Sequence, residues 1–340
     1  MIAAMNTGAI INDPVMRALL ITLTALALDA LIGDPPALYR RLPHPVVLIG
    51  RLIDWMDARF NDPHRRPAIN RTAGLISALV AILAAATSGA VIARFGGWLD
   101  SQTGLGWLIE ALAASVLLAG RSLRDHVMAV ATGLEQNLDE GRRAVSAIVG
   151  RDPDSLDEAA VARAAVESAA ENFSDGLTAP LFWLLIGGLP GLCAYKAINT
   201  LDSMIGHLSP RYRHFGWAAA RIDDAANFIP ARLSALLLAA AGTLLGRGRA
   251  ALAAAWRDAG HHRSPNAGWP EAAMGGALDL ALAGPRRYGE RVVNDPFIGG
   301  SGTADAQAIR RAVCLLDATR ILIATVLAAT LTLRLLSVSL

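Results

Sequence analysis

The sequence predicts an all-α polytopic integral membrane protein with about four transmembrane helices. Its 340 residues are 54% hydrophobic and only 18% charged, a balance well away from that of soluble domains. Several uncharged apolar stretches approach the roughly 20 residues that cross a hydrocarbon core. The alternating pattern of half-buried β-strands is nearly absent. We therefore expect a single membrane-embedded domain over residues 1–340, and the net charge of +2 gives no indication of nucleic-acid binding.

Six apolar stretches account for the membrane part of this prediction. The expected spans cover residues 18–33, 73–93, 104–120 and 321–340. Prolines and glycines interrupt a fifth stretch, residues 177–193, and a sixth, residues 233–246, is short for a crossing. We expect membrane-buried or re-entrant helices in these last two places, because broken backbone is tolerated at membrane depth where protein or a wet cavity covers it.

The distribution of arginine predicts the orientation. Segment 34–72 carries seven Arg residues and segment 121–320 carries many more, whereas the turn over residues 94–103 has one. Cytoplasmic loops carry an excess of basic residues. We therefore expect both long segments to face the cytoplasm and to hold the catalytic residues, with both termini outside.

Lys196 is the only lysine among 31 basic residues. A compact ammonium and a planar guanidinium are not interchangeable, so its retention indicates a site. The alternative is a chance survivor in an arginine-rich composition. On a helix, Lys196, Asn199 and Ser203 would share one face, and Asp202 would line a neighbouring stripe. A loop-to-helix junction with satisfied polar groups would also explain this run.

Three carboxylates mark the end of an Ala-rich predicted helix. Glu167 and Glu171 are four residues apart and share a face, and Asp175 follows just before Gly176. Oxygen ligands of this kind suit Mg²⁺, which keeps waters and substrate phosphates in its shell. The alternative is a solvated acidic face on which Arg163 pairs with Glu167 at a spacing of four.

Two more polar groups follow along the chain. Asp223 and Asn227 stack at a spacing of four, next to Asp224 and ahead of an apolar helix that also carries Arg232. Adjacent carboxylates beside a bilayer are costly unless they are paired or bind metal. The second group is a proline-rich loop with Ser264 and Asn266, which a simple capped turn would also explain.

Phosphate-binding loops of the P-loop type are excluded, because the sole lysine follows Tyr195 rather than a glycine. The run Gly299-Gly300-Ser301-Gly302-Thr303 is a weak phosphate-loop candidate, and its composition favours a flexible connector.

Taken in order, these motifs resemble the CobD/CbiB family of adenosylcobinamide-phosphate synthases over roughly residues 28–300. The matching pieces are Asp34-Pro-Pro with His44-Pro45, Glu167-Ser-x-x-Glu171-Asn172-x-x-Asp175-Gly176, Lys196-x-x-Asn199-Thr200-x-Asp202-Ser203-Met204-x-Gly206, Asp223-Asp224-x-x-Asn227-x-x-Pro230-x-Arg232, and Ser264-Pro-Asn266 through Met274. Each piece is weak alone, but the ordered set is specific. Ala267 departs from the Ser expected in many relatives, and the first fifteen residues and the last span carry no resemblance.

The resemblance implies an ATP-dependent, Mg²⁺-requiring ligase of the cell inner membrane, with its active site facing the cytoplasm. The enzyme would join the propionate carboxylate of adenosylcobyric acid to the amine of aminopropanol phosphate and form adenosylcobinamide phosphate. We expect an acyl-phosphate intermediate. The expected surroundings are the lipid bilayer, with no nucleic acid and with either a homo-oligomer or other corrinoid-pathway enzymes as partners.

Individual roles are then assigned by residue type. The expected catalytic residues are Lys196, Asp223, Asp224 and Arg232. The expected Mg²⁺ ligands are Glu167, Glu171 and Asp175. The expected substrate-binding residues are His44, Asn172, Asn199, Asp202, Ser203, Asn227, Ser264 and Asn266.

Two other classes of function remain open from the sequence. A membrane corrinoid transporter would use Asp29 and Glu110, which lie within the predicted spans, as coupling groups. A non-catalytic binding or scaffold protein would have no need of several carboxylates at metal spacing. A transporter needs its polar groups at the bilayer midplane, whereas here they cluster in long segments on one side.

Overall fold

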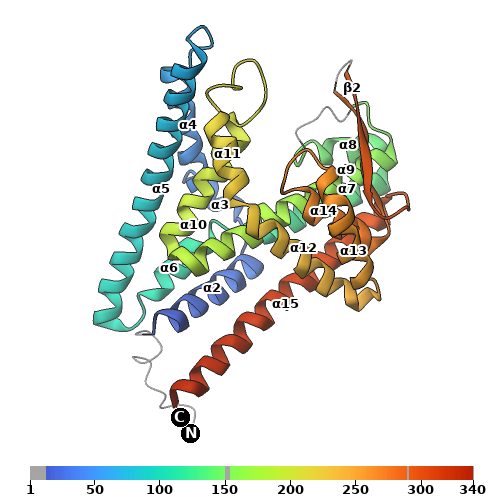
Figure 1. Ribbon diagram of the computed structural model, residues 1–340. Helices are drawn as coiled ribbons and strands as arrows, with labels where there is room; N and C mark the ends of the chain where they lie inside the picture. The colour runs from blue at the N-terminus through green and yellow to red at the C-terminus, as the bar shows by residue number, and fades with distance from the viewer. Residues whose placement is uncertain (1–12, 150–153, 289–290, 340) are drawn as a thin grey trace. The chain divides into compact units, whose positions relative to one another are not determined.

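The chain forms an all-α polytopic membrane protein with one added β-hairpin (Figure 1). The structure, a computed structural model, describes residues 13–149, 154–288 and 291–339. Five of its helical segments are long and apolar enough to cross a membrane. They are Pro14–Leu31, Pro67–Thr103, Glu158–Ile205, Phe228–Leu245 and Ala306–Ser337.

Three of the predicted spans coincide with long helices. They are α2 (Pro14–Leu31), α5 (Pro67–Thr103) and α15 (Ala306–Ser339), and residue 340 lies outside the described residues. The stretch 104–120 differs from expectation. Its helix, α6 (Trp107–Ser115), has nine residues, about 14 Å at 1.5 Å per residue, and cannot cross a core about 30 Å thick. Gly104, at φ 71°, ends α5 in the left-handed conformation and turns the chain into this short helix.

The two stretches expected to be buried or re-entrant lie in the remaining long segments. Helix α10 (Ala179–Ile205) is kinked at Gly188, which has φ 61° and ψ −160°, two residues before Pro190. Helix α12 (Phe228–Gly242) continues into a short 3₁₀ turn, Thr243–Leu245. Sharp kinks in helices occur mainly at prolines and glycines, and both lie at this kink. Whether these segments cross or re-enter stays a prediction.

The chain divides into two compact units, and the single membrane-embedded domain expected over residues 1–340 stays a prediction. The first unit comprises Met1–Ala119, Ala179–Ala226 and Val326–Leu340, and the second comprises Gly120–Thr178 and Asn227–Thr325. Each is built from separate stretches of sequence, so chain neighbours such as Ala226 and Asn227 belong to different units.

In the first unit, α5 packs beside α4 (Pro45–Phe60), α10 and α11 (Trp217–Ala226) (Figure 1). Its core includes Ile53, Leu201 and Phe215. Gly74 of α5 allows the backbone around Phe215, just ahead of α11, to lie against α5, because a Cβ at position 74 would lie 1.8 Å from the carbonyl oxygen of Phe215. Helix α2 packs on α6, and α3 (Pro36–Tyr39) precedes α4.

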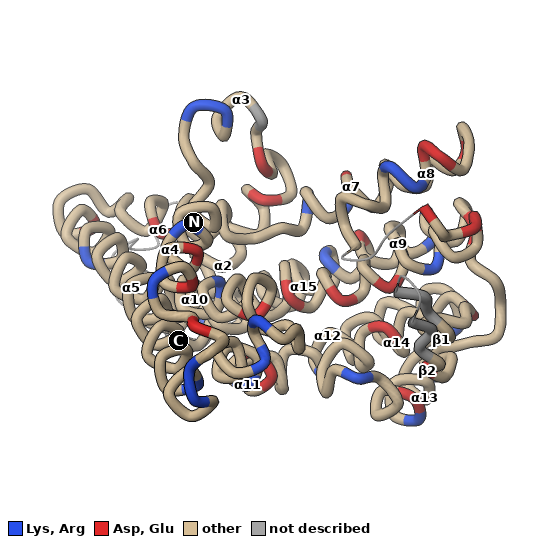
Figure 2. The backbone as a smooth tube through the Cα atoms, turned by 90° about the horizontal axis from the view of Figure 1, so that it is seen from above, with Lys and Arg blue, Asp and Glu red and all other residues tan. Residues whose placement is uncertain are grey.

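The second unit surrounds α14 (Gly268–Leu278), a helix in which every residue except Trp269 is buried. Its other helices are α7 (Gly120–Gln136), α8 (Leu138–Val145), α9 (Glu158–Phe173), α12, α13 (Gly248–Asp258) and the part of α15 up to Thr325, with a 3₁₀ turn over Ala259–His261. Figure 2 shows that α8 carries acidic residues followed by basic ones, whereas α5 of the first unit is almost uncharged between its ends.

A β-hairpin in the second unit was not expected. Strand β1 (Ala281–Tyr288) pairs antiparallel with β2 (Arg291–Gly299). Its register shifts between Ala283 and Pro285, where Ala283 and Gly284 have φ of 59° and 78°. Prolines in both strands and a bulge of this kind break the alternating pattern that identifies strands in a sequence.

Candidate functional site

The predicted site residues divide between the two units. The first unit holds His44, Lys196, Asn199, Asp202, Ser203, Asp223 and Asp224. The second unit holds Glu167, Glu171, Asn172, Asp175, Asn227, Arg232, Ser264 and Asn266. Each group is described within its own unit.

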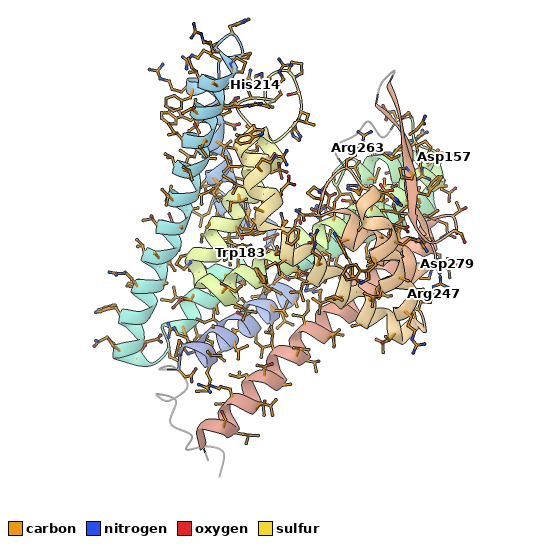
Figure 3. The ribbon with its side chains drawn as sticks, in the orientation of Figure 1. Asp157, Trp183, His214, Arg247, Arg263 and Asp279 are labelled. Carbon is orange, nitrogen blue, oxygen red and sulfur yellow. The ribbon has the colours of Figure 1, made fainter. Side chains whose placement is uncertain are left out.

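In the first unit, polar residues of α10 and α11 lie together. The two helices pack, and the Trp183 indole N–H of α10 donates to the Ala226 carbonyl of α11 at 3.2 Å (Figure 3). Lys196 is 8% exposed, an unusual degree of burial for an ammonium. Asp202 is half-buried and close enough to Asp224 for their charges to interact. The sequence therefore brings a cation and an acidic pair to neighbouring helices.

Burial sets the behaviour of Asp224. It raises the pKa of this carboxyl, although the Arg221 guanidinium, 3.8 Å away, acts in the opposite direction. A carboxylate with a raised pKa is a better proton acceptor. Asp223 beside it is half-buried, as is Asn199, whereas Ser203 is exposed and its hydroxyl donates to the Asn199 carbonyl at 2.8 Å.

His44 has a structural role that the sequence did not reveal. Its Nδ1 accepts from the Val46 amide at 3.2 Å and caps α4. Its Nε2 lies 3.0 Å from the Val116 carbonyl oxygen, which requires the proton on Nε2. Tyr39 packs edge-on against the ring. Both ring nitrogens are thus engaged within the fold, and the substrate-binding role of His44 stays a prediction.

The three carboxylates at the end of α9 differ in their surroundings. Glu167 is 5% exposed, and its Oε1 accepts from the Ala283 amide of β1 at 2.7 Å. Glu171 is exposed, and Asp175 is half-buried in a π-helical turn, Ser174–Thr178. Turns of this type recur at functional sites. Within the described parts of the chain, no three His, Cys, Asp or Glu side chains form a group that could hold a metal ion.

Asn172 bonds back onto its own helix. Its Nδ2 donates to the Ser168 carbonyl at 2.9 Å and lies 3.0 Å from the Ser168 hydroxyl. The side chain is exposed, so its amide oxygen remains accessible to solvent.

Arg232 on α12 holds the loop that precedes α14. Its guanidinium carbon lies 3.8 Å from the Phe228 ring centroid and 4.8 Å from that of Trp269. Its Nη1 donates to Asn266 Oδ1 at 2.9 Å and to the Phe228 carbonyl at 2.8 Å. Its Nη2 donates to the Pro265 carbonyl at 3.3 Å.

The loop itself is internally bonded. The Ser264 hydroxyl accepts from the amides of Asn266 and Ala267, each at 3.2 Å. Asn266 is 6% exposed, and Asn227, which precedes α12, is 1% exposed. We call Arg232 with residues 264–267 the arginine latch. The spacing of four between Phe228 and Arg232 was a visible signal for part of it, but nothing in the sequence paired Arg232 with Trp269.

Comparison with known families identifies the chain's relatives. Residues 22–316 match the family model described as CobD/Cbib protein. The chain belongs to the CobD/CbiB family. Every predicted site residue falls inside the matched range, which extends beyond the motif-bearing part of the sequence at both ends.

Individual members of this family are close in sequence. A Sinorhizobium protein named Cobalamin biosynthesis protein CobD is 54% identical over 293 residues, covering 85% of this chain and 90% of its own. The Brucella suis protein of the same name is 52% identical, covering 85% and 89%. The Rhodobacter capsulatus one is 50% identical, covering 82% and 85%. No solved structure gives a significant match.

Proposed function

We propose that the protein is an ATP-dependent, amide-forming ligase of cobalamin biosynthesis. It would attach aminopropanol phosphate to the propionate carboxylate of adenosylcobyric acid and release adenosylcobinamide phosphate. The observation that carries the proposal is family membership, with relatives at least 50% identical that are named for cobalamin biosynthesis. The ordered motifs and the buried Lys196 support it further.

The chemistry needs an activated acyl group, because a carboxylate is a poor acyl donor. A carboxylate oxygen would attack the γ-phosphorus of ATP, form an acyl phosphate and release ADP. The amine nitrogen would then attack the acyl carbon, and inorganic phosphate would leave as the amide forms. One proton from the nitrogen must pass to a base.

Asp224 suits the part of this base, because burial raises its pKa and improves its ability to accept a proton. Asp202 on the neighbouring helix α10 would add a second negative charge close to Asp224. Lys196 would neutralise charge on the transferring phosphoryl group, a task for a compact ammonium that can follow moving oxygens.

Mg²⁺ would be held by Glu171 and Asp175. The former is exposed and the latter half-buried at the end of one helix, and Mg²⁺ commonly takes only one or two protein carboxylates. Glu167 fits less well, because its Oε1 is hydrogen-bonded to the β1 backbone. When bound, Mg²⁺ would offset the negative charge of the nucleotide phosphates.

Arg232 would act as a positioning residue. Its donors are directed at Asn266, Pro265 and its own helix, so it would shape the substrate-binding loop rather than contact phosphate. We place the enzyme in the inner membrane with its active site facing the cytoplasm, in keeping with the arginine-rich segments.

The direct test is incubation of the purified protein with adenosylcobyric acid, Mg-ATP and aminopropanol phosphate, followed by mass spectrometry. We expect amide product and ADP in equal amounts, no amide when aminopropanol phosphate is omitted, and neither product when ATP is omitted. Corrinoid binding without ADP or amide would instead favour a transporter or a non-catalytic binding protein.

Lys196→Arg tests the proposed role of the ammonium. The variant keeps the charge but replaces a point charge by a wider, planar group. Loss of a well-placed electrostatic stabiliser costs a factor of roughly 10²–10³ in turnover. We expect normal insertion and corrinoid binding with kcat lowered at least about tenfold. Wild-type turnover would make Lys196 an ordinary cation.

A further inference from the structure

A pocket in the second unit contains none of the residues to which the proposed chemistry assigns a role. It has a volume of about 410 Å³ and lies between the start of α9, the base of the hairpin and the loop that leads to α15. Its lining includes Arg163 of α9, Phe297 of β2, and the loop residues Ser301 to Ala304. This volume falls in the range of small-molecule sites.

Arg163 places a guanidinium at this pocket whose N–H groups make few contacts with the rest of the protein. Its guanidinium lies over the Phe297 ring, 5.7 Å from the centroid. The nearest carboxylate oxygen, Glu167 Oε1, is 4.0 Å from Arg163 Nε, too far for a hydrogen bond, and is already bonded to the Ala283 amide. Arg163 makes no hydrogen bond to the residues that the structure describes. Five N–H donors in a planar fork match a phosphate group.

The loop opposite Arg163 is fixed in shape. The Gly300 and Gly302 amides donate to Leu280 and Asp279 carbonyls at 2.8 and 2.9 Å, and the Ala281 amide donates to Gly302 at 2.8 Å. A Cβ on Gly302 would lie 2.4 Å from the Asp279 carbonyl oxygen. Asp279 is itself held by Arg247, with Nη2 3.1 Å from Oδ1 (Figure 3). The loop is therefore no flexible connector.

This fixed loop leaves polar groups available at the pocket. The Ser301 and Thr303 side chains are exposed, and both residues line the cavity. Ala304 is 4% exposed, yet its amide donates to no carbonyl or side chain in the described ranges. A buried amide normally has an acceptor. The Ser301 and Thr303 hydroxyls, the Ala304 amide and the Arg163 guanidinium together form a set of hydrogen-bond donors at this pocket.

The geometry points to a phosphate-binding site, with Arg163 as the charged ligand and the hydroxyls of Ser301 and Thr303 as additional donors. The ligand class is a small phosphate ester. Two sources carry this group, an aminoalkyl phosphate and a nucleotide. The assignment rests on the pocket alone and does not require the proposed ligase activity.

The test is a binding measurement on the full-length protein in detergent, without corrinoid and without turnover. Isothermal titration with aminopropanol phosphate and, separately, with ATP gives a Kd for each source. The variants are Arg163→Gln, Arg163→Lys and Thr303→Val, with Arg249→Gln as the control because Arg249 is an exposed arginine of the same unit. A melting curve for each variant checks folding.

We expect Arg163→Gln to lower the affinity for one of the two ligands about ten- to a hundredfold, the usual result of losing a hydrogen bond to a charged group. Thr303→Val should lower the affinity for the same ligand by a smaller factor. Arg163→Lys should bind this ligand more tightly than Arg163→Gln but less tightly than the wild type, and Arg249→Gln should bind it with wild-type affinity. The ligand that responds identifies the source. Unchanged affinity for both ligands, or an equal loss in Arg249→Gln, would overturn the assignment.

Discussion

Two arginines of the second unit are used in opposite ways. Arg232 lies between two aromatic rings and donates to three acceptors, so its guanidinium is committed to the latch. Arg163 contacts one ring, has its nearest carboxylate at 4.0 Å, and lines a cavity. The sequence placed Arg232 among the expected catalytic residues, but the N–H donors that the fold leaves unused favour Arg163 as the ligand of a phosphate group. An arginine is available to a ligand only if the fold has not used its N–H groups.

The largest effect is expected at a third arginine, in the first unit, which is paired with two carboxylates. Arg17 of α2 bridges Asp100 and Glu110, with Nη2 2.5 Å from Glu110 Oε1. Both carboxylates are under 10% exposed. Arg17→Met leaves them without their cation, and breaking a buried pair costs about 3–5 kcal/mol.

Thermal or denaturant unfolding in detergent measures this loss, with Arg94→Met as the exposed control. If Arg17→Met unfolded at the same midpoint as the wild type, pairing with two buried carboxylates would not make an arginine important for stability. The same result would revive Glu110 as a coupling group of a transporter.

Arg232→Met should release the latch. The variant loses three hydrogen bonds and the charged contact with two rings, and we expect a loss of about 2–3 kcal/mol of unfolding free energy. Hydrogen exchange in residues 262–269 should accelerate, while affinity for phosphate esters stays within about twofold. Unchanged exchange together with lost phosphate binding would reverse the assignments of the two arginines.

Gly302→Ala should damage the pocket rather than the latch. The added methyl would overlap the Asp279 carbonyl oxygen at 2.4 Å, and overpacking of this kind costs about 1–3 kcal/mol. We expect weaker phosphate-ester binding in the same titration. Gly260→Ala is the matched control, because a Cβ there meets nothing within 4 Å. Equal affinity in both variants would show that the loop shape does not matter.

The smallest effect concerns pH. Burial alone would raise the pKa of Asp258, but Arg257 and the Gly299 amide, 2.8 Å from Asp258 Oδ2, bring this pKa below its ordinary value. A lowered pKa gives stability that is present above the unfolded-state pKa, about 3.9, and is lost as pH falls through the folded-state value.

Asp258→Asn should therefore lower the free energy of unfolding by about 1 kcal/mol near neutral pH. Below about pH 4 the difference in stability between the variant and the wild type should become smaller, because Asp258 of the wild type is then protonated. Unfolding midpoints between pH 3 and 7 measure this. A difference that is constant over the whole range would exclude ionisation of Asp258 as the source of the effect.

Much of the fold followed from local patterns. Long uncharged stretches fixed α2, α5 and α15, because a helix of about 20 apolar residues is recognisable without knowledge of its neighbours. The stretch 104–120 was overestimated, since Gly104 and Gly106 divide an apolar run whose composition alone looked continuous. The hairpin was missed because its prolines and bulge hide the alternation of a strand.

The candidate site was only partly accessible to the same reasoning. Lys196, Asn199 and Asp202 lie on one helix, as the helical alternative for this run required. It did not separate Glu167 from Glu171, because the partner of Glu167 is an amide 116 positions away in β1. Contacts between distant segments decide which polar groups are already satisfied, and no local pattern records them.

The most direct test of this account measures two properties on the same preparations of Arg163→Gln and Arg232→Met, namely the unfolding midpoint and the Kd for the responding phosphate ester. We predict that Arg163→Gln loses affinity at least about tenfold with a midpoint close to wild type, and that Arg232→Met loses stability with affinity largely kept. If Arg232→Met lost the affinity and Arg163→Gln did not, the distinction between committed and available arginines would be wrong for this protein.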